Sequence, residues 1–274
     1  MTSSLTLAYS PCPNDTYIFA ALANGWLRDA PVVNVTLADV EALNRAAFEG
    51  TYDITKVSYA AVPALNSRYK LLRSGGALGY NCGPLLVARP GSSQRLADFK
   101  TATIAIPGVG TTAYLLLQMA LEPAGAMKEM RFDSIATAVE RGEADAGLII
   151  HEARFTFQDS GLVQVMDLGE WWHQQTQLPL PLGAILARRE LSDDRAAQIE
   201  SAIRASLRFA RENEHQVLNY VRRSTNESDE VIRKHIALYV NDFSDDLGPQ
   251  GDAAVNELFS RSRIRRLKEA AGHA

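Results

Sequence analysis

The stretch that decides the fold lies in the middle of the chain, where residues 142–151 read GEADAGLIIH. Gly142 follows a predicted helix at 135–141, and glycine commonly ends helices. Residues 145–150 form a largely apolar run that suits a buried strand. This run predicts that His151 leaves the core at the carboxyl end of a strand.

The same order of residues occurs near the N-terminus, where residues 50–54 read GTYDI. A predicted helix at 40–49 precedes this segment, and a predicted strand at 52–57 overlaps its end. Upstream, strands at 5–9 and 102–106 each lead through a turn into an apolar helix, and further strands are expected at 33–37 and near 130. Asp53 and Asp145 hold the same place in the two passages, 92 positions apart. This repetition predicts two related α/β lobes.

Two apolar segments mark where the chain passes between the lobes. They read GPLLVAR at 83–89 and GAILARR at 183–189. One precedes the second lobe and the other follows it, so the chain leaves lobe one, builds lobe two and returns. We therefore assign residues 1–89 and 184–274 to lobe one and residues 90–183 to lobe two. Two crossings predict a hinge and a cleft, with the carboxyl ends of strands facing it.

Composition limits the function classes. The 274 residues are 46% hydrophobic and 22% charged, with a net charge of −4, so a packed core is expected and a basic nucleic-acid surface is not. Cys12 and Cys82 form neither a disulfide framework nor a metal pair, and we expect reduced thiols. The N-terminus lacks the pattern of a signal peptide, and no run of 18 apolar residues occurs. We expect a cytoplasmic protein that does not insert into a membrane, and its oligomeric state is left open.

In lobe one, the candidate site residues follow the predicted strands. Asn14 and Asp15 could contact a ligand, but capping of the next helix is favoured. Lys56 near the end of an apolar strand must reach solvent or an anion. Ser58 should begin a helix, as a ligand donor or as its cap. Cys12 is a weaker candidate, a nucleophile without a neighbouring histidine.

In lobe two, the segment GVGTT at 108–112 could bind a carboxylate. Its glycines allow close approach, and the helix amides with the hydroxyls of Thr111 and Thr112 could form an anion nest that includes Gly110. The simpler alternative is that Thr111 only caps its helix. The segment matches neither a dinucleotide fingerprint nor a phosphate loop.

His151 is the candidate general base, because imidazole titrates near neutral pH. A structural histidine is the alternative, and His173 in the segment WWH at 171–173 is the rival base. His215 and His235 fall in predicted helices and are interpreted as structural or solvated. Trp171, Trp172 and the segment 178–183 could cover a flat ring or pack a hinge. No histidine or cysteine pair has the spacing of metal ligands, so we predict no metal.

Several long motifs together resemble the 1,4-dihydroxy-6-naphthoate synthase family of the futalosine route to menaquinone. The resemblance runs from about Leu5 to Phe243. The motifs are SPCPNDT (10–16), KVSYAA (56–61), RSGGALG (73–79), GLIIHE (147–152) and LPLPLGA (178–184). Tyr17, where the family commonly has phenylalanine, is a conservative difference.

The resemblance implies an α/β, two-lobed fold of the periplasmic-binding-protein type (type II), with mixed sheets, helices on both faces and an inter-lobe cleft. It implies a lyase that converts cyclic dehypoxanthinylfutalosine, a small carboxylate substrate, to 1,4-dihydroxy-6-naphthoate without a cofactor. It also implies that His151 is the proton acceptor. The segments implied to contact substrate are Lys56, Val57 and Ser58 in lobe one and Thr111 and Thr112 in lobe two.

Three other classes share parts of this pattern. An exported solute-binding protein would share the fold, and fold alone does not give function. Chorismate dehydratase, a related enzyme of the same route, would share the lobes without the long motifs. A ligand-sensing regulatory module is disfavoured because no DNA-binding segment is visible.

Overall fold

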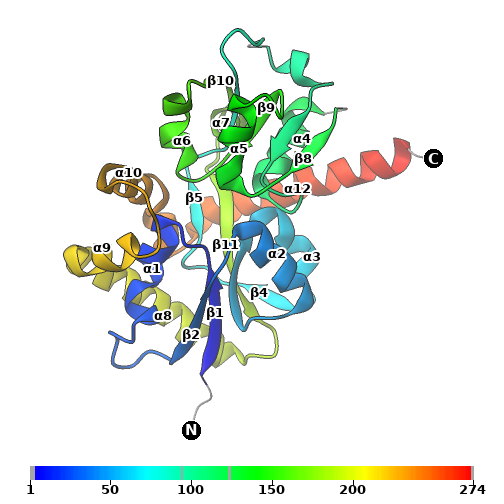
Figure 1. The fold of residues 1–274 in the computed structure, drawn as a ribbon. Helices are drawn as coiled ribbons and strands as arrows, with labels where there is room; N and C mark the ends of the chain where they lie inside the picture. The colour runs from blue at the N-terminus through cyan, green and yellow to red at the C-terminus, as the bar shows by residue number, and fades with distance from the viewer. Residues whose placement is uncertain (1–3, 94, 123–124, 273–274) are drawn as a thin grey trace. The chain divides into compact units, whose positions relative to one another are not determined.

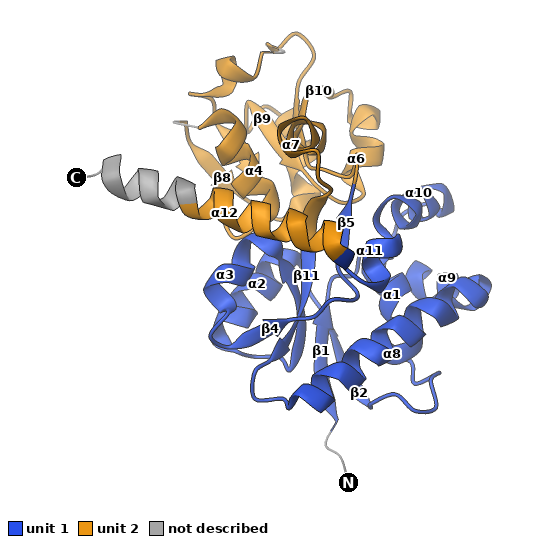
Figure 2. Ribbon diagram, turned by 180° about the vertical axis from the view of Figure 1, so that it is seen from behind, with its two compact units in different colours: residues 1–79, 183–248 blue, residues 80–182, 249–274 orange. Residues whose placement is uncertain are grey.

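The computed structural model describes residues 4–93, 95–122 and 125–272. The chain divides into two compact units (Figure 2): unit 1 comprises residues 1–79 and 183–248, and unit 2 comprises residues 80–182 and 249–274. These bounds differ from the expected lobes at three places, because residues 80–89 and the C-terminal helix group with unit 2 and Gly183 groups with unit 1. The apolar run at 83–89 suits a buried strand in either sheet, so its sequence could not indicate which strands it pairs with.

Unit 1 is built on a six-stranded mixed sheet with the order β2-β1-β3-β11-β4, and β5 pairs with β11 (Figure 1). Strand β1 is parallel to β2 and β3, whereas β11 is antiparallel to β3 and β4. The strands span Leu5–Tyr9 (β1), Val33–Leu37 (β2), Ile54–Ser58 (β3), Tyr69–Leu71 (β4), Ala77–Gly79 (β5) and Leu180–Arg188 (β11).

Helices pack against this sheet and complete the core of unit 1. Phe19 of α1 and Ile203 of α8 are fully buried in one apolar cluster with Leu7 of β1. This packing buries the apolar stripe of α8, which includes Ile199, Ile203 and Leu207. The helices span Pro13–Ala23 (α1), Val40–Glu49 (α2), Val62–Leu65 (α3), Asp193–Glu212 (α8), Glu214–Arg222 (α9), Asp229–Tyr239 (α10) and Asp242–Asp245 (α11).

Unit 2 contains a five-stranded mixed sheet with the order β10-β6-β9-β7-β8. Strand β7 is parallel to β8 and β9, and β6 is antiparallel to β9 and β10. The strands span Leu85–Ala88 (β6), Ile104–Ile106 (β7), Met127–Glu129 (β8), Ala146–Ile149 (β9) and Val163–Asp167 (β10). The helices span Thr112–Leu121 (α4), Ile135–Glu140 (α5), Ala153–Thr156 (α6), Leu168–Thr176 (α7) and Gly248–Gly272 (α12).

A close contact between α5 and β9 explains the glycine inside the apolar run of unit 2. A Cβ atom at Gly147 would lie 2.6 Å from Cγ2 of Ile135 and 2.7 Å from Cγ2 of Val139. The missing side chain lets the helix approach the strand, as glycine does where backbone elements come close. None of the described helices is long and apolar enough to cross a membrane.

The repeated aspartates perform the same task in both units. Asp53 Oδ2 accepts from the backbone nitrogen of Thr6 at 2.8 Å, and Asp145 Oδ2 accepts from the backbone nitrogen of Thr103, also at 2.8 Å. Asp53, just before β3, is thus tied to Thr6 near the start of β1, and Asp145, just before β9, is tied to the residue that precedes β7. The predicted repeat therefore corresponds to a shared local structure in the two units.

Candidate functional site

The candidate residues of unit 1 gather at the carboxyl ends of β1 and β3, which are parallel neighbours. Helix α1 begins here at Pro13, and Cys12 at its N-cap position makes no side-chain cap bond. The expectation that Asn14 or Asp15 caps this helix is wrong, because both residues lie within its first turn. Their side chains instead bond to groups on other segments.

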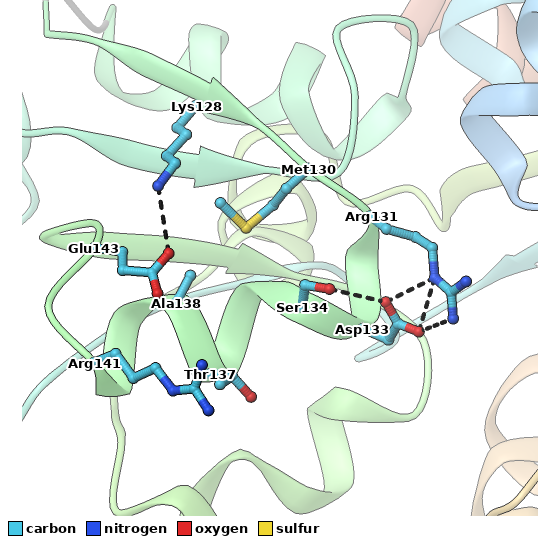
Figure 3. A pocket seen from close by; sticks show the side chains of 9 residues that line it. All are labelled: Lys128, Met130, Arg131, Asp133, Ser134, Thr137, Ala138, Arg141 and Glu143. Carbon is cyan, nitrogen blue, oxygen red and sulfur yellow. Dashed lines mark hydrogen bonds and ion pairs between the residues drawn. The ribbon is translucent and has the colours of Figure 1, made fainter.

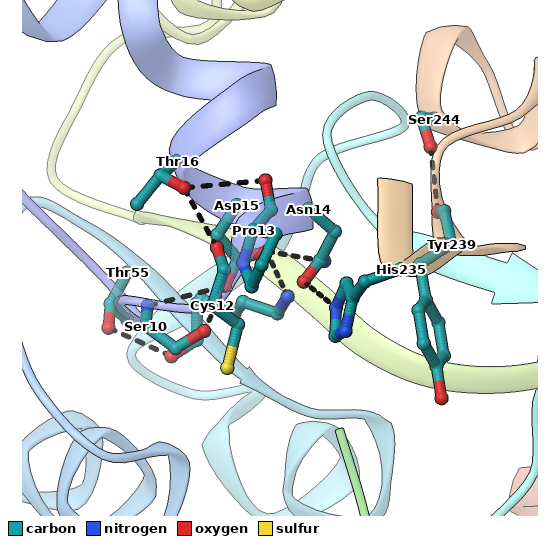
Figure 4. A network of polar contacts seen from close by, with 11 residues as sticks. Ser10, Cys12, Pro13, Asn14, Asp15, Thr16, Thr55, His235, Tyr239 and Ser244 are labelled. Carbon is teal, nitrogen blue, oxygen red and sulfur yellow. Dashed lines mark hydrogen bonds and ion pairs between the residues drawn. The ribbon is translucent and has the colours of Figure 1, made fainter. Parts of the chain in front are cut away.

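Asp15 is the centre of a buried polar network (Figure 4). Its Oδ2 atom accepts from the hydroxyl of Ser10 at 2.6 Å, and its Oδ1 atom accepts from Nδ2 of Asn14 at 2.8 Å. The Nζ atom of Lys56 forms an ion pair with the same carboxylate. Asp15 is therefore the anion that the buried lysine requires, since a buried charge is stable only when paired and hydrogen-bonded.

Gly183 makes room for the lysine side chain. Strand β11 runs beside β3, with Gly183 opposite Ser58 and Ile185 opposite Lys56. A Cβ atom at Gly183 would lie 2.5 Å from Cε of Lys56. The absence of a side chain at Gly183 thus leaves room for the lysine side chain beside β11.

Asn44 of α2 holds Ser58 in a defined orientation, a role that the sequence did not indicate. Asn44 Oδ1 accepts from the backbone nitrogen of Ser58 at 2.8 Å, and Nδ2 lies 3.3 Å from the Ser58 hydroxyl oxygen. Ser58 makes no side-chain cap bond to the helical turn that follows it. Because Nδ2 of Asn44 donates a hydrogen bond to the Ser58 hydroxyl oxygen, the hydroxyl hydrogen of Ser58 can be donated to another group. Val57 between Lys56 and Ser58 is fully buried.

In unit 2, the segment 108–112 joins the end of β7 to α4. Thr111 stands at the N-cap position, where its hydroxyl oxygen accepts from the backbone nitrogen of Tyr114 at 3.2 Å and donates to the carbonyl of Gly108 at 2.7 Å. Thr111 therefore caps α4. The hydroxyl of Thr112 donates to the carbonyl of Leu182 at 3.1 Å. Gly110 lies in the same turn.

His151 follows β9 at the same edge of the sheet, because β7 and β9 are parallel neighbours. Its backbone is left-handed, with φ of 57°. A non-glycine residue rarely adopts this conformation, and such positions often occur at functional sites. The imidazole is partly buried and meets the ring of Phe132 edge-on, with the centroids 4.9 Å apart.

Arg154 anchors the short segment that carries His151. Its Nη1 atom donates to the carbonyl of Gly83 at 2.6 Å, and its Nη2 atom donates to Asp167 Oδ2, also at 2.6 Å. Asp167 also caps α7 by accepting from the backbone nitrogen of Gly169 at 2.8 Å. One guanidinium thus fastens α6, just after His151, to the end of β10 and to the residues before β6.

The remaining candidates have other surroundings. The indole nitrogen of the buried Trp172 donates to the carbonyl of Pro179 at 3.0 Å, which favours packing over a ring-binding role. The ring centroids of His173 on α7 and Tyr80 lie 5.2 Å apart. Cys12 and Cys82 are both buried, and they are not joined in a disulfide, which agrees with the expectation of reduced thiols. Burial raises the pKa of the Cys82 thiol to about 12, so this thiol is protonated near neutral pH.

A cavity of about 670 Å³ opens in unit 2 between β8 and α5 (Figure 3). Lys128 there pairs with Glu143 at 3.5 Å, and Arg131 pairs with Asp133. None of the predicted site residues lines this cavity. Its lining residues are Lys128, Met130, Arg131, Asp133, Ser134, Thr137, Ala138, Arg141 and Glu143.

Solved structures with a similar fold define the class of this protein. A crystal structure of a protein from Archaeoglobus fulgidus has a TM-score of 0.90 and 35% identity, covering 96% of this chain and 98% of that chain. The periplasmic aliphatic sulphonate binding protein SsuA from Escherichia coli has a TM-score of 0.64 and 15% identity, covering 96% and 89%. The fold is thus α/β with two mixed sheets, of the periplasmic-binding-protein kind.

Sequence comparison narrows this class to one family. Residues 5–263 match a family model described as menaquinone biosynthesis. A 1,4-dihydroxy-6-naphthoate synthase from Thermus thermophilus is 48% identical over 265 residues, which is 96% of both chains. One from Streptomyces coelicolor is 43% identical over 98% of this chain and 96% of its own. The chain belongs to the menaquinone-biosynthesis family, and within it to the enzymes of the 1,4-dihydroxy-6-naphthoate synthase group.

Proposed function

We propose that this enzyme converts cyclic dehypoxanthinylfutalosine to 1,4-dihydroxy-6-naphthoate. The reaction would be a base-initiated elimination that releases a small sugar-derived fragment while the ring becomes aromatic. The observation that carries the proposal is the placement of His151, which leaves a buried strand in a left-handed conformation at the edge where site residues are expected. The relatives named as 1,4-dihydroxy-6-naphthoate synthases support the choice of reaction.

In this proposal His151 is the proton acceptor. A neutral imidazole can accept a proton near neutral pH, and a positioned general base typically accelerates a reaction by about 10²- to 10⁴-fold. The edge-on contact with Phe132 restricts rotation of the ring, and the bonds of Arg154 fix the backbone nearby. A base held in this way needs little reorganisation before proton transfer.

The substrate would be held by Lys56, Val57 and Ser58 of unit 1 and by Thr111 and Thr112 of unit 2. Asp15 already balances the charge of Lys56, so the lysine would contribute orientation more than net attraction. The carboxylate of the substrate would then be bound mainly by hydroxyl and amide donors. Ser58 is one of these donors, because Nδ2 of Asn44 donates to its hydroxyl oxygen and the hydroxyl hydrogen can be directed towards a ligand. Asn14, Asp15 and Gly110 are additional positions in the proposed site.

Aromatisation would supply the driving force, and we assign the reaction no cofactor or metal. The protein would act in the cytoplasm on a small carboxylate molecule and would have no nucleic-acid partner.

Substitution of the proposed base gives the direct test. His151→Ala should lower turnover of cyclic dehypoxanthinylfutalosine by about 10²- to 10⁴-fold, because the general base is removed. His173→Ala serves as the matched variant, because His173 is the rival base. The measurement is formation of the naphthoate, with circular dichroism to show that both variants stay folded. Near-wild-type turnover by His151→Ala, or a large loss only in His173→Ala, would reject the assignment.

The same assay separates the other classes. Tight binding without turnover would indicate a solute-binding protein, and turnover of chorismate would indicate a dehydratase. Formation of the naphthoate by the wild-type enzyme would exclude both.

A further inference from the structure

We propose that His235 is a positioning residue for the substrate-binding edge of unit 1, acting through Asn14 on the Asp15–Lys56 pair. This inference rests on the proposed function, in which these residues adjoin the substrate. His235 lies on α10, more than 170 residues along the chain from Lys56. The sequence suggested only a structural or solvated role for it.

The two side-chain hydrogen bonds of Asn14 determine which group donates and which accepts between His235 and Asp15. Asn14 Nδ2 donates to Asp15 Oδ1 at 2.8 Å, and a carboxylate in an ion pair can only accept. Asn14 Oδ1 therefore faces the other way, and it lies 2.9 Å from Nε2 of His235. Since a carbonyl oxygen only accepts, His235 must carry a proton on Nε2. The bonding pattern thus assigns the donor atom of this histidine.

The histidine is itself held firmly (Figure 4). His235 is only 1% exposed, and its ring lies 4.5 Å from the ring of Tyr239, one turn further along α10. The hydroxyl of Ser228 caps the start of the helix by accepting from the backbone nitrogen of Val231 at 3.3 Å. The imidazole therefore presents its Nε2 proton in one direction.

Loss of this donor should change the polar network without removing any member of it. With no partner for its oxygen, the carboxamide of Asn14 can rotate and withdraw Nδ2 from Asp15. Asp15 would then keep Ser10 and Lys56 but lose one of its donors. The position of the lysine ammonium, which the proposed function places beside the substrate, would become less defined.

The kinetic test uses variants of the full-length enzyme. His235→Phe keeps a ring but has no donor, whereas His235→Gln restores an N–H group. His215→Phe is the matched control, because His215 lies exposed on the neighbouring helix α9. We expect His235→Phe to raise KM about tenfold with kcat within about twofold, as a lost buried hydrogen bond suggests. His235→Gln should recover most of this loss, and His215→Phe should not differ from wild type.

A spectroscopic measurement separates this inference from the proposed function. In wild-type protein with ¹⁵N-labelled histidine and asparagine, NMR should show a proton on Nε2 of His235. The Asn14 carboxamide signals should shift in His235→Phe and return in His235→Gln. These results would support the positioning role even if the naphthoate were not formed and the proposed function failed. An unprotonated Nε2 atom, unchanged Asn14 signals in His235→Phe, or equal KM values for His235→Phe and wild type would overturn it.

Discussion

Lys56 and Asp15 show how single residues set the character of the unit 1 edge. Their side chains are 4% and 0% exposed, so neither charge is stabilised by bulk water. Removal of one member of such a pair typically costs about 3–5 kcal/mol, because the other charge is left buried and unpaired. The pair therefore makes this edge rigid while keeping it nearly neutral, which suits hydrogen-bond recognition of an anionic substrate.

Gly183 provides a sharp test of this arrangement. Gly183→Ala should lower the free energy of unfolding by about 2 kcal/mol, as overpacking does, because the new Cβ overlaps Cε of Lys56. The displaced lysine should also lower kcat/KM about tenfold. Urea unfolding and steady-state kinetics check the two effects.

Gly25→Ala is the matched control for that prediction. Gly25 has a left-handed backbone, with φ of 67°, and a Cβ there would have nothing within 4 Å. This variant should lose stability through backbone strain and keep its kcat/KM. An equal kinetic loss in both variants would show that reduced stability, and not displacement of the lysine, is responsible.

At the scale of elements, the short connection after β9 matters most. His151 occupies a turn between β9 and α6, and turns of this kind are mobile unless side chains secure them. Arg154 and Asp167 secure it with side chains that are only 16% and 10% exposed. The proposed base thus owes its position to a contact three residues further along the chain.

Arg154→Met should therefore reduce both stability and turnover. We expect the free energy of unfolding to fall by about 3 kcal/mol, because Asp167 would keep a largely buried charge without its partner. Turnover should fall while KM changes less, since the base is proposed to act on a bound substrate. Thermal unfolding and steady-state kinetics are the measurements.

The double variant Arg154→Met with Asp167→Asn is the control for charge. Asparagine can still accept the α7 cap bonds, so only the buried charge is removed. This variant should regain part of the stability but not the turnover. Full recovery of turnover would show that Arg154 does not help to hold His151.

At the scale of the whole molecule, the described residues include an apolar core within each of the two units. One packs α1, α8 and the sheet of unit 1, and the other packs α5 and the sheet of unit 2. Units with their own cores often unfold in separate steps. We therefore expect a destabilising substitution in one unit to lower the free energy of unfolding of that unit more than that of the other.

A matched pair of isoleucines tests this independence. Ile203 in unit 1 and Ile135 in unit 2 are both 0% exposed and both lie on helices. Each change to alanine should cost about 2–5 kcal/mol. Hydrogen exchange should show that Ile203→Ala weakens protection mainly in β1 and β3, and that Ile135→Ala does so mainly in β7 and β9. Equal loss of protection in all four strands with either variant would show a single cooperative unit.

Local sequence was sufficient for most elements. The pattern at 5–9 predicted β1, and Gly50 and Gly142 marked the ends of the predicted helices that correspond to α2 and α5, because strand periodicity and helix-ending glycines act over a few residues. Local sequence misassigned β6, since strand partners are chosen by the whole sheet. It also expected Asn14 or Asp15 to be a cap, because residues of this type at a helix start usually are.

The sequence by itself determined the repeated α/β pattern, the strand-end position of His151 and, through its long motifs, the family. Only the tertiary structure decided that Asp15 is the partner of Lys56, that Asn44 orients Ser58 and that His235 bonds to Asn14. The physical reason is range: backbone preferences depend on neighbours within a turn or two, whereas a buried polar group is satisfied by whichever chain segment folding brings within about 3 Å of it.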